Sequence, residues 1–263
     1  MATRRSVLAG AMIAPLLLTA TACEGDSMDG RRPEGTAGDP AVLTARPGAA
    51  APGPTRKPGV HALGVAETRD AIVFLPESLA TDAPVPLLVA LHGAGGDAQG
   101  GLSVLRAAAE QLGIAIFAPA SRGTTWDAMR GRFGPDTDVI NRALEEIFSF
   151  VPVDPERIGV AGFSDGASYA LGLGLANGDL FRKVLAFSPG FVPAGPQIGR
   201  PAIFIAHGTK DTVLPIDATS RRVVPALERQ GYEVVYREFD GPHTVPSAIA
   251  VEAALWLDWT PTP

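Results

Sequence analysis

Cysteine, clustered positive charge and long apolar runs are all scarce in this sequence of 263 residues. Its one cysteine, Cys23, leaves the chain without an internal disulfide. Only 19% of the residues are charged, the net charge is −6, and no basic patch with interleaved aromatic residues occurs, so nothing indicates nucleic-acid binding. The apolar run at residues 7–18 is too short to span a bilayer. With 46% hydrophobic residues the chain can still bury a sizeable core, and its length suggests one domain with appendages.

Residues 1–22 resemble an export signal and are excluded from the fold. Arg4 and Arg5 precede the apolar run as in a twin-arginine signal, and residues 20–22 (ATA) offer small side chains at a cleavage site. Cys23 follows directly, so the pattern resembles a lipobox, in which the cysteine is lipidated and becomes the new N-terminus. Ordinary cleavage, leaving an unmodified cysteine, is the alternative. Both interpretations predict an extracytoplasmic protein, either secreted or tethered to a membrane through Cys23.

Two further segments follow the signal. Residues 23–65 are rich in glycine, proline, alanine and threonine without apolar periodicity, which predicts a disordered linker. Residues 66–260 alternate apolar strands with helical patterns, which predicts an α/β domain with a doubly wound, mostly parallel sheet. The expected strands are residues 66–75, 87–91, 114–118, 158–163, 183–187, 203–206 and 234–239. The expected helices are residues 98–112, 137–150 with Asp136 as a cap, 218–230 with Asp217 as a cap, and 245–258.

The motif GFSDG at residues 162–166 carries the most information. It lies between an apolar strand and an alanine-rich helix, and its two glycines flank Ser164 at the spacing of a nucleophile elbow. Such a turn exposes the serine hydroxyl above the sheet, beside helix N–H groups that can stabilise a developing negative charge. The plainer interpretation, that Ser164 only caps the helix, leaves the downstream motifs unexplained.

A base and an acid follow in the order expected for this elbow. Asp211 and His243 each lie just after a predicted strand, and the order Ser…Asp…His is that of α/β-hydrolases. Asp217 is the rival acid, although it reads as a helix cap. His207 is expected to pack and hydrogen-bond beneath the acid loop rather than to act as the base.

A glycine-rich loop follows the apolar strand 87–91 and reads HGAGG from residue 92. Backbone N–H groups in such a loop can turn toward an oxyanion, and the expected donors are the N–H groups of Ala94 and Asp165. His92 is expected to order this loop. His92, Gly93 and Trp126 are the candidate substrate-binding residues, with Trp126 equally placed to be part of the core.

These motifs resemble those of compact α/β-hydrolases, in particular the phospholipase/carboxylesterase and polyhydroxybutyrate-depolymerase-like esterase groups. The resemblance covers residues 66–258. Asp165 departs from it, because those groups more often carry glutamine or asparagine after the serine. The matching residues are His92-Gly93, Trp126-Asp127, the Ser164 elbow, His207-Gly208 with Asp211, and Gly241-Pro242-His243.

The sequence therefore predicts a serine carboxylesterase that cleaves a small-molecule ester through an acyl-enzyme, with no metal or organic cofactor implied. The segment between residues 185 and 201 is too short for a helical cap, so we expect an open site. An acyltransferase or a peptidase would use the same triad with another acceptor or leaving group. A non-catalytic surface binding protein on the same scaffold is the alternative from a different class.

Overall fold

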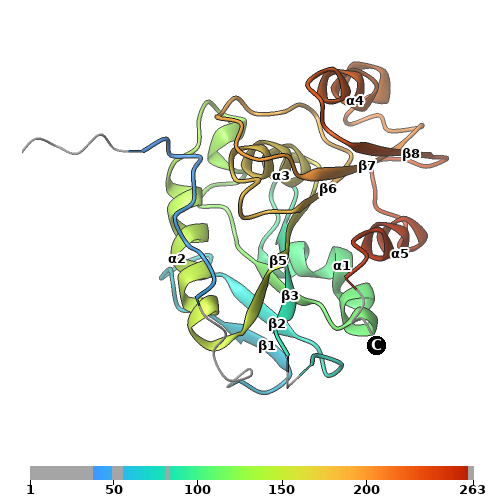
Figure 1. Ribbon diagram of the computed structural model, residues 1–263. Helices are drawn as coiled ribbons and strands as arrows, with labels where there is room; N and C mark the ends of the chain where they lie inside the picture. The colour runs from blue at the N-terminus through green and yellow to red at the C-terminus, as the bar shows by residue number, and fades with distance from the viewer. Residues whose placement is uncertain (1–37, 49–55, 81–82, 260–263) are drawn as a thin grey trace, which may run out of the picture. The chain divides into compact units, whose positions relative to one another are not determined.

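A single twisted sheet organises the chain in the computed structural model, which describes residues 38–48, 56–80 and 83–259 (Figure 1). Within these residues eight strands lie in the order β1-β2-β4-β3-β5-β6-β7-β8. The first two pairings, β1 with β2 and β2 with β4, are antiparallel, and all later ones are parallel. The strands are β1 (Gly59–Ala62), β2 (Ile72–Leu75), β3 (Val85–Leu91), β4 (Ala115–Ala118), β5 (Val153–Phe163), β6 (Lys183–Phe187), β7 (Ala202–Gly208) and β8 (Val234–Phe239).

Helices cover both faces of the sheet, as predicted for a doubly wound fold. Figure 1 shows α1 (Ala98–Leu112) and α5 (Ser247–Trp256) on one side, and α2 (Pro135–Phe150) and α3 (Asp165–Ala176) on the other. The remaining helix, α4 (Ser220–Arg229), packs its apolar residues into the same core as α2 and α3. Because both faces are covered, the central strands can be apolar throughout, and every residue of β3 is buried.

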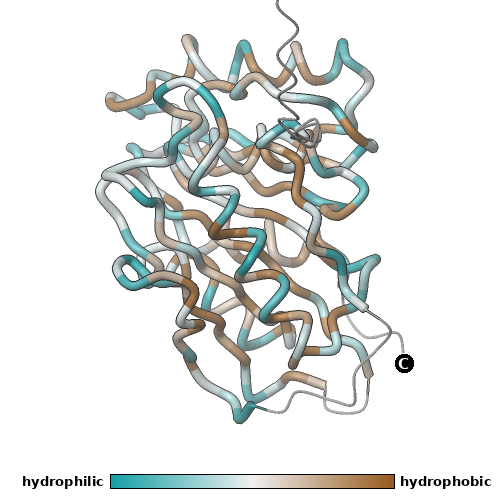
Figure 2. Tube along the Cα trace, turned by 90° about the vertical axis from the view of Figure 1, so that its left-hand side faces the viewer, coloured by the Kyte–Doolittle hydropathy of each residue, from teal (hydrophilic) through white to brown (hydrophobic). Residues whose placement is uncertain are grey.

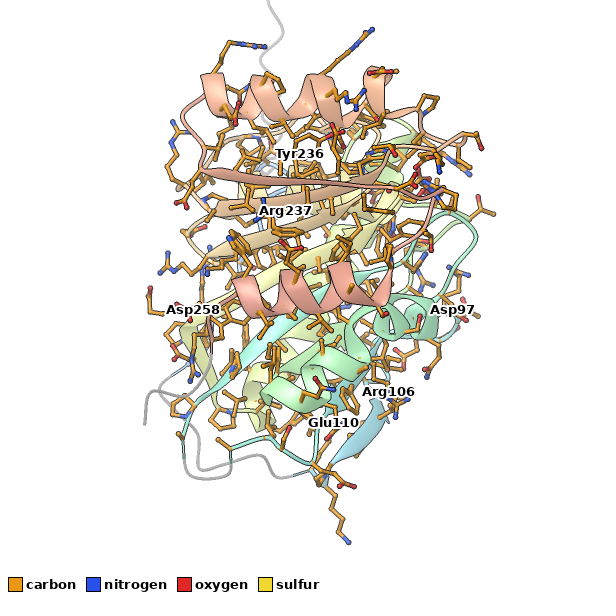
Figure 3. All side chains as sticks on the ribbon, turned by 90° about the vertical axis from the view of Figure 1, so that its right-hand side faces the viewer. Asp97, Arg106, Glu110, Tyr236, Arg237 and Asp258 are labelled. Atoms are coloured by element: carbon orange, nitrogen blue, oxygen red, sulfur yellow. The ribbon has the colours of Figure 1, made fainter. Side chains whose placement is uncertain are left out.

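The helices begin and end where local sequence directs them. Asp97 caps α1 by accepting a hydrogen bond from the Gly100 N–H at 2.8 Å, and Gly113 ends the helix with φ of 67°. Figure 3 shows α1 and α5 lying across the near face of the sheet, with Asp97 and Asp258 at its opposite ends. Since α1 follows the carboxyl end of β3, Asp97 marks the edge of the sheet at which the candidate site lies.

The N-terminal boundary of the domain differs from the prediction. Residues 38–48, expected to be disordered linker, run along α2 in an extended strap (Figure 1). Asn177 clamps this strap, because its Oδ1 accepts from the Leu43 N–H at 2.7 Å and its Nδ2 donates to the Ala41 carbonyl at 2.8 Å. Between residues 41 and 45 every second side chain is buried: Ala41, Leu43 and Ala45. Helix α2 alternates brown and teal along its turns in Figure 2, as an amphipathic helix should.

Replacing Leu43 with alanine should lower the free energy of unfolding by about 2–5 kcal/mol, because the leucine is only 2% exposed and leaves a cavity. Urea unfolding followed by circular dichroism measures the change. The same substitution at Leu255, which is 56% exposed, is the control and should cost less than about 1 kcal/mol. Equal, small effects at the two leucines would mean that the strap is not part of the folded domain.

Three further details correct the sequence-based expectations. Strand β1 lies within the predicted linker, so the edge strand expected at residues 66–75 shrinks to β2 and gains an outer neighbour. Asp136 does not cap α2, which begins after Gly134; its carboxylate instead binds backbone N–H groups of the preceding loop. Asp217 lies within a short 3₁₀ turn before α4 and makes no cap.

The predicted export signal and Cys23 lie outside the described residues, as do residues 24–37 and 49–55 of the predicted linker. A search of the described helices finds none long and apolar enough to cross a membrane.

Candidate active site

Ser164 stands at a strained turn between β5 and α3. Its φ of 58° and ψ of −122° fall in a region of backbone angles that residues other than glycine rarely adopt. The turn is closed by the glycines that flank it: a Cβ on Gly162 would collide with the Gly166 carbonyl, and one on Gly166 with the carbonyls of Leu91 and His92. The predicted nucleophile elbow is therefore present, and its glycines are required by close backbone approach.

Three loops at the carboxyl ends of the parallel strands β5, β7 and β8 bring a serine, an aspartate and a histidine together. His243 Nδ1 lies 2.5 Å from Asp211 Oδ2, and His243 Nε2 lies 2.9 Å from Ser164 Oγ. A carboxylate only accepts hydrogen bonds, so Nδ1 carries the proton and donates it, and Nε2 of the neutral ring accepts from the serine hydroxyl. The arrangement can abstract the serine proton as an acyl bond forms.

Asp211 is held in place by its own loop. Its Oδ1 accepts from the backbone N–H groups of Val213 at 2.9 Å and Leu214 at 2.8 Å, and its side chain is fully buried. Burial alone would raise the pKa of Asp211, but the N–H of Leu214 and the ring of His243 outweigh it and hold this pKa below its usual value. The carboxylate is therefore ionised at neutral pH, as a group that orients a histidine must be.

The rival acid is elsewhere. The side chain of Asp217 is 80% exposed and pairs with Arg221 at 2.7 Å. The structure thus brings Asp211, and not Asp217, to His243.

The loop after β3 lies against the elbow, as expected for an oxyanion loop. The Cβ of Ser164 is 3.4 Å from the point where a Cβ on Gly93 would stand. Among the hydrogen bonds of the described residues, the N–H groups of Ala94 and Asp165 have no acceptor. Two unpaired N–H groups beside the serine remain the candidate oxyanion donors.

His92 supports this loop from beneath and is only 2% exposed. Its Nε2 accepts from the Ser121 N–H at 3.0 Å, so its Nδ1 donates to the Gly93 carbonyl at 2.6 Å. Burial lowers the pKa of His92, which keeps the ring neutral and this hydrogen-bond pattern intact. As expected, His92 orders the loop; its burial removes it from the candidate substrate-binding residues.

Trp126 is also a structural residue. It is completely buried and its Nε1 donates to the His92 carbonyl at 2.8 Å. Its ring packs between those of His92 and Tyr169, with centroids 4.8 and 5.0 Å away. Of its two interpretations, substrate wall or core, the structure supports the core.

Two carboxylates, a buried one on Asp136 and a half-buried one on Asp127, hold the loop that carries Trp126. Asp127 Oδ2 accepts from the Asp136 N–H at 2.9 Å, and Asp136 Oδ2 accepts from the Asp127 N–H at 2.7 Å. Asp136 Oδ1 also accepts from the Arg122 N–H, and Tyr169 donates to Asp127 Oδ1. Burial raises the pKa of both carboxyls, although their hydrogen bonds oppose the rise. This pair of carboxylates therefore fixes the wall behind the oxyanion loop.

One contact in the site has no signal in the sequence. Asp165, the residue that departs from the esterase pattern, accepts a hydrogen bond from Thr125 Oγ1 at 2.5 Å. This bond ties the start of α3 to the Trp126 loop, and residues 40 positions apart reveal no such pairing by spacing alone. The carboxylate of Asp165 thus has a hydrogen-bond donor, Thr125, close to it in space.

The site is open toward solvent. The segment between β6 and β7, residues 188–201, is described throughout and contains no helix. As predicted, it forms no cap over the elbow. A cavity of about 430 Å³ adjoins His243 and is walled by Phe163 and by side chains of α1 and α5. The described residues contain no group of three or more histidine, cysteine, aspartate or glutamate side chains placed to hold a metal ion.

Comparison with known proteins yields esterases. No family model matches the chain. It is 29% identical over 159 residues to NocK of Nocardia uniformis subsp. tsuyamanensis, which is named as an esterase, and this match covers 55% of the chain and 46% of NocK. It is 28% identical over 190 residues to an Aspergillus niger protein named as a feruloyl esterase C, covering 67% of each. The chain thus spans about half to two thirds of the length of these relatives.

A solved structure agrees on the fold. The carboxylesterase of Bacillus cereus has a TM-score of 0.56 and 20% identity, with 72% of this chain and 92% of that one covered. At this identity the likeness concerns the backbone alone. Together with the parallel sheet, the elbow and the Ser-Asp-His order, it gives the conclusion that this chain has the compact α/β-hydrolase fold.

Proposed function

We propose that this protein is an exported serine esterase that hydrolyses small carboxylic esters. The observation that carries the proposal is the unbroken hydrogen-bond chain from Ser164 Oγ through His243 to Asp211. Ser164 attacks the ester carbonyl while His243 takes its proton, and the N–H groups of Ala94 and Asp165 hold the oxyanion. His243 then protonates the leaving alcohol, and water enters by the same steps to release the acid. Asp211 keeps the ring in the required tautomer.

A fluorophosphonate probe tests the chemistry. It should label the protein at Ser164, and labelling should disappear in Ser164→Ala and in boiled protein. Hydrolysis of p-nitrophenyl esters should accompany labelling and continue unchanged in excess EDTA, because no step uses a metal. If the protein neither reacts with the probe nor hydrolyses any of the esters, it would be a binding protein on a hydrolase scaffold. Loss of activity in EDTA, restored by a divalent ion, would overturn the mechanism.

Short, soluble acyl esters are the expected substrates, because the described residues form no cap that would enclose the elbow and hold a long chain. Rates for a short-chain ester should rise hyperbolically with concentration through the solubility limit, and activity should fall as the acyl chain lengthens. A chain-length series of p-nitrophenyl esters, run beside feruloyl and polyester substrates, measures this. A sharp rise in rate once the substrate forms an emulsion, or a preference for long-chain triacylglycerol, would contradict it and point to a lipase.

Export with lipidation at Cys23 is the second part of the proposal. It is supported by Arg4 and Arg5 before the apolar run and by the small residues before the cysteine. In a bacterial host that exports through the twin-arginine system, metabolic labelling with a fatty-acid analogue should mark the wild-type protein. Cys23→Ala should abolish the label, and Arg4→Lys with Arg5→Lys should leave the precursor unprocessed. Wild-type protein found unlabelled in the medium would favour ordinary cleavage instead.

A further inference from the structure

A second histidine lies beneath the acid of the triad. His207, near the end of β7, is completely buried, and its Nε2 is 3.1 Å from Asp211 Oδ2. This is the same oxygen that accepts from His243 at 2.5 Å, so Oδ2 stands between two imidazole rings. The mechanism described above leaves His207 unused. A buried imidazole in contact with a catalytic carboxylate nevertheless changes the electrostatic potential at that carboxylate.

The proton on His207 can be placed from its partners. Nε2 lies 2.9 Å from the carbonyl oxygen of Leu214, which can only accept, so Nε2 carries a hydrogen. Nδ1 lies 2.7 Å from Ser220 Oγ, which therefore donates to it. Burial lowers the pKa of His207 and keeps the ring neutral, with one hydrogen and this one tautomer.

Leu214 links this ring to the acid through its backbone. Its carbonyl accepts from His207, while its N–H donates to Asp211 Oδ1 at 2.8 Å. His207 thus acts on both carboxylate oxygens: its N–H holds the residue whose own N–H binds Oδ1, and its Nε2 lies 3.1 Å from Oδ2.

We propose that His207, oriented by Ser220, is a positioning residue for Asp211 that limits how strongly the carboxylate attracts a proton on His243. The proposal rests on the triad chemistry proposed above. The partial positive charge of an N–H group whose nitrogen lies 3.1 Å from Oδ2 stabilises negative charge on the oxygen that His243 binds. Without it, Asp211 would stabilise the imidazolium form of His243 more, and the base would be lost to protonation at a higher pH.

Other charged groups surround this pair and are common to all variants, so they cancel in a comparison. Glu238, the β8 residue opposite His207, is tied to Arg221 of α4, and the acid and base loops carry an ion pair between Lys210 and Asp240. The cavity walls that α1 and α5 present to His243 carry no charged side chain. These elements also carry Asp165 at the start of α3, Asp217 and Arg222 around the start of α4, and Arg237 of β8, which pairs with Glu252 of α5.

Two substitutions of nearly equal size separate the two ends of the ring. In His207→Gln, the amide nitrogen reaches the position of Nε2 and can donate to Leu214, while Ser220 loses its partner. In His207→Asn, the shorter amide reaches Ser220, while Leu214 and Asp211 Oδ2 lose the N–H. Each leaves one buried polar group unpaired, so the two should cost similar stability.

The pH profile should nevertheless differ between them. We expect the acidic limb of kcat/KM to move up by roughly 0.5–1 pH unit in His207→Asn and to stay near the wild-type position in His207→Gln. Imidazole NMR titration of the ¹⁵N-labelled, unliganded protein should show the same shift in the protonation midpoint of His243. Because the NMR readout needs no turnover, it tests this inference even if the protein proves not to hydrolyse esters.

Equal midpoints for His243 in wild type, His207→Asn and His207→Gln would overturn the proposal and leave His207 a packing residue. Equal shifts in both variants would do so too, because they would trace the effect to general loosening of the site and not to the N–H that only His207→Asn removes. If neither variant folds by near-ultraviolet circular dichroism, Ser220→Ala replaces them. It removes only the hydroxyl that orients the ring, and an upward shift supports the proposal whereas an unchanged midpoint rejects it. Fluorophosphonate labelling of wild-type Ser164, run in parallel, shows separately whether the proposed hydrolase chemistry holds.

Discussion

Replacing Ser164 with alanine is expected to lower kcat/KM for a p-nitrophenyl ester by about 10⁴-fold or more, because the reaction then lacks its nucleophile. The melting temperature should change little, since alanine occupies the same strained turn and the hydroxyl is removed from a half-exposed position. Any remaining rate would come from the oxyanion donors acting on water. Steady-state kinetics on protein checked by circular dichroism measures the loss.

Ser168 provides a matched control one helical turn later. Its hydroxyl accepts from the Gly190 N–H at 2.9 Å, so Ser168→Ala should cost some stability but less than about tenfold in rate. Adding His243→Ala to Ser164→Ala should lower the rate little further, because residues that act as a unit are not additive. A Ser164→Ala protein with more than about a tenth of the wild-type rate would show that another group is the nucleophile.

Asp211→Asn is expected to lower kcat/KM by about 10³- to 10⁴-fold, whereas Asp217→Asn should leave it within about twofold. An amide at position 211 cannot accept from His243 and from two backbone N–H groups as the carboxylate does, so the ring loses its tautomer and orientation. Asp217 forms only an exposed ion pair with Arg221. Comparing the two variants under identical conditions decides which aspartate serves the triad, and the opposite ranking would reverse the assignment.

The loss of stability in Asp211→Asn, measured against the wild-type protein, should depend on pH in a defined direction. The pKa of Asp211 is lowered in the folded protein, so its carboxylate contributes stability above the unfolded value of about 3.9 and loses that contribution as the pH falls through the folded value. The difference in unfolding free energy between wild type and variant should therefore be greatest near neutral pH and shrink below about pH 4. Urea unfolding at a series of pH values measures it.

Local sequence was a reliable guide to features that depend only on residues close together along the chain. The glycines beside Ser164 are needed within one turn, and Gly113 ends α1 by its own backbone freedom, so both could be predicted from spacing. Ser164, Asp211 and His243 each follow a strand of the parallel part of the sheet, which also placed them at one edge, because parallel strands end together.

Features that depend on contacts between residues far apart in the sequence could not be predicted in this way. The strap at residues 38–48 reads as linker, since the short alternation at residues 41–45 lies in a proline- and glycine-rich stretch and has no apparent partner until Asn141 and Asn177 bind its backbone. Asp136 has the spacing of a helix cap, yet its carboxylate is satisfied by N–H groups of Arg122 and Asp127 in a loop that folds back on it. Trp126 could be wall or core until its ring was found beneath His92.

By itself, then, the sequence determined the doubly wound sheet, the elbow and the identity of the serine and histidine, because hydrophobic periodicity and turn chemistry are encoded within a few residues. Only the tertiary structure decided which aspartate meets His243, which tautomer His207 holds and which buried groups support the oxyanion loop. Each of those depends on a hydrogen bond between residues brought together by packing: the 2.5 Å contact of Asp211 with His243 joins positions 32 residues apart. A buried donor or acceptor must find a partner wherever the fold supplies one, and that partner is not marked in the sequence.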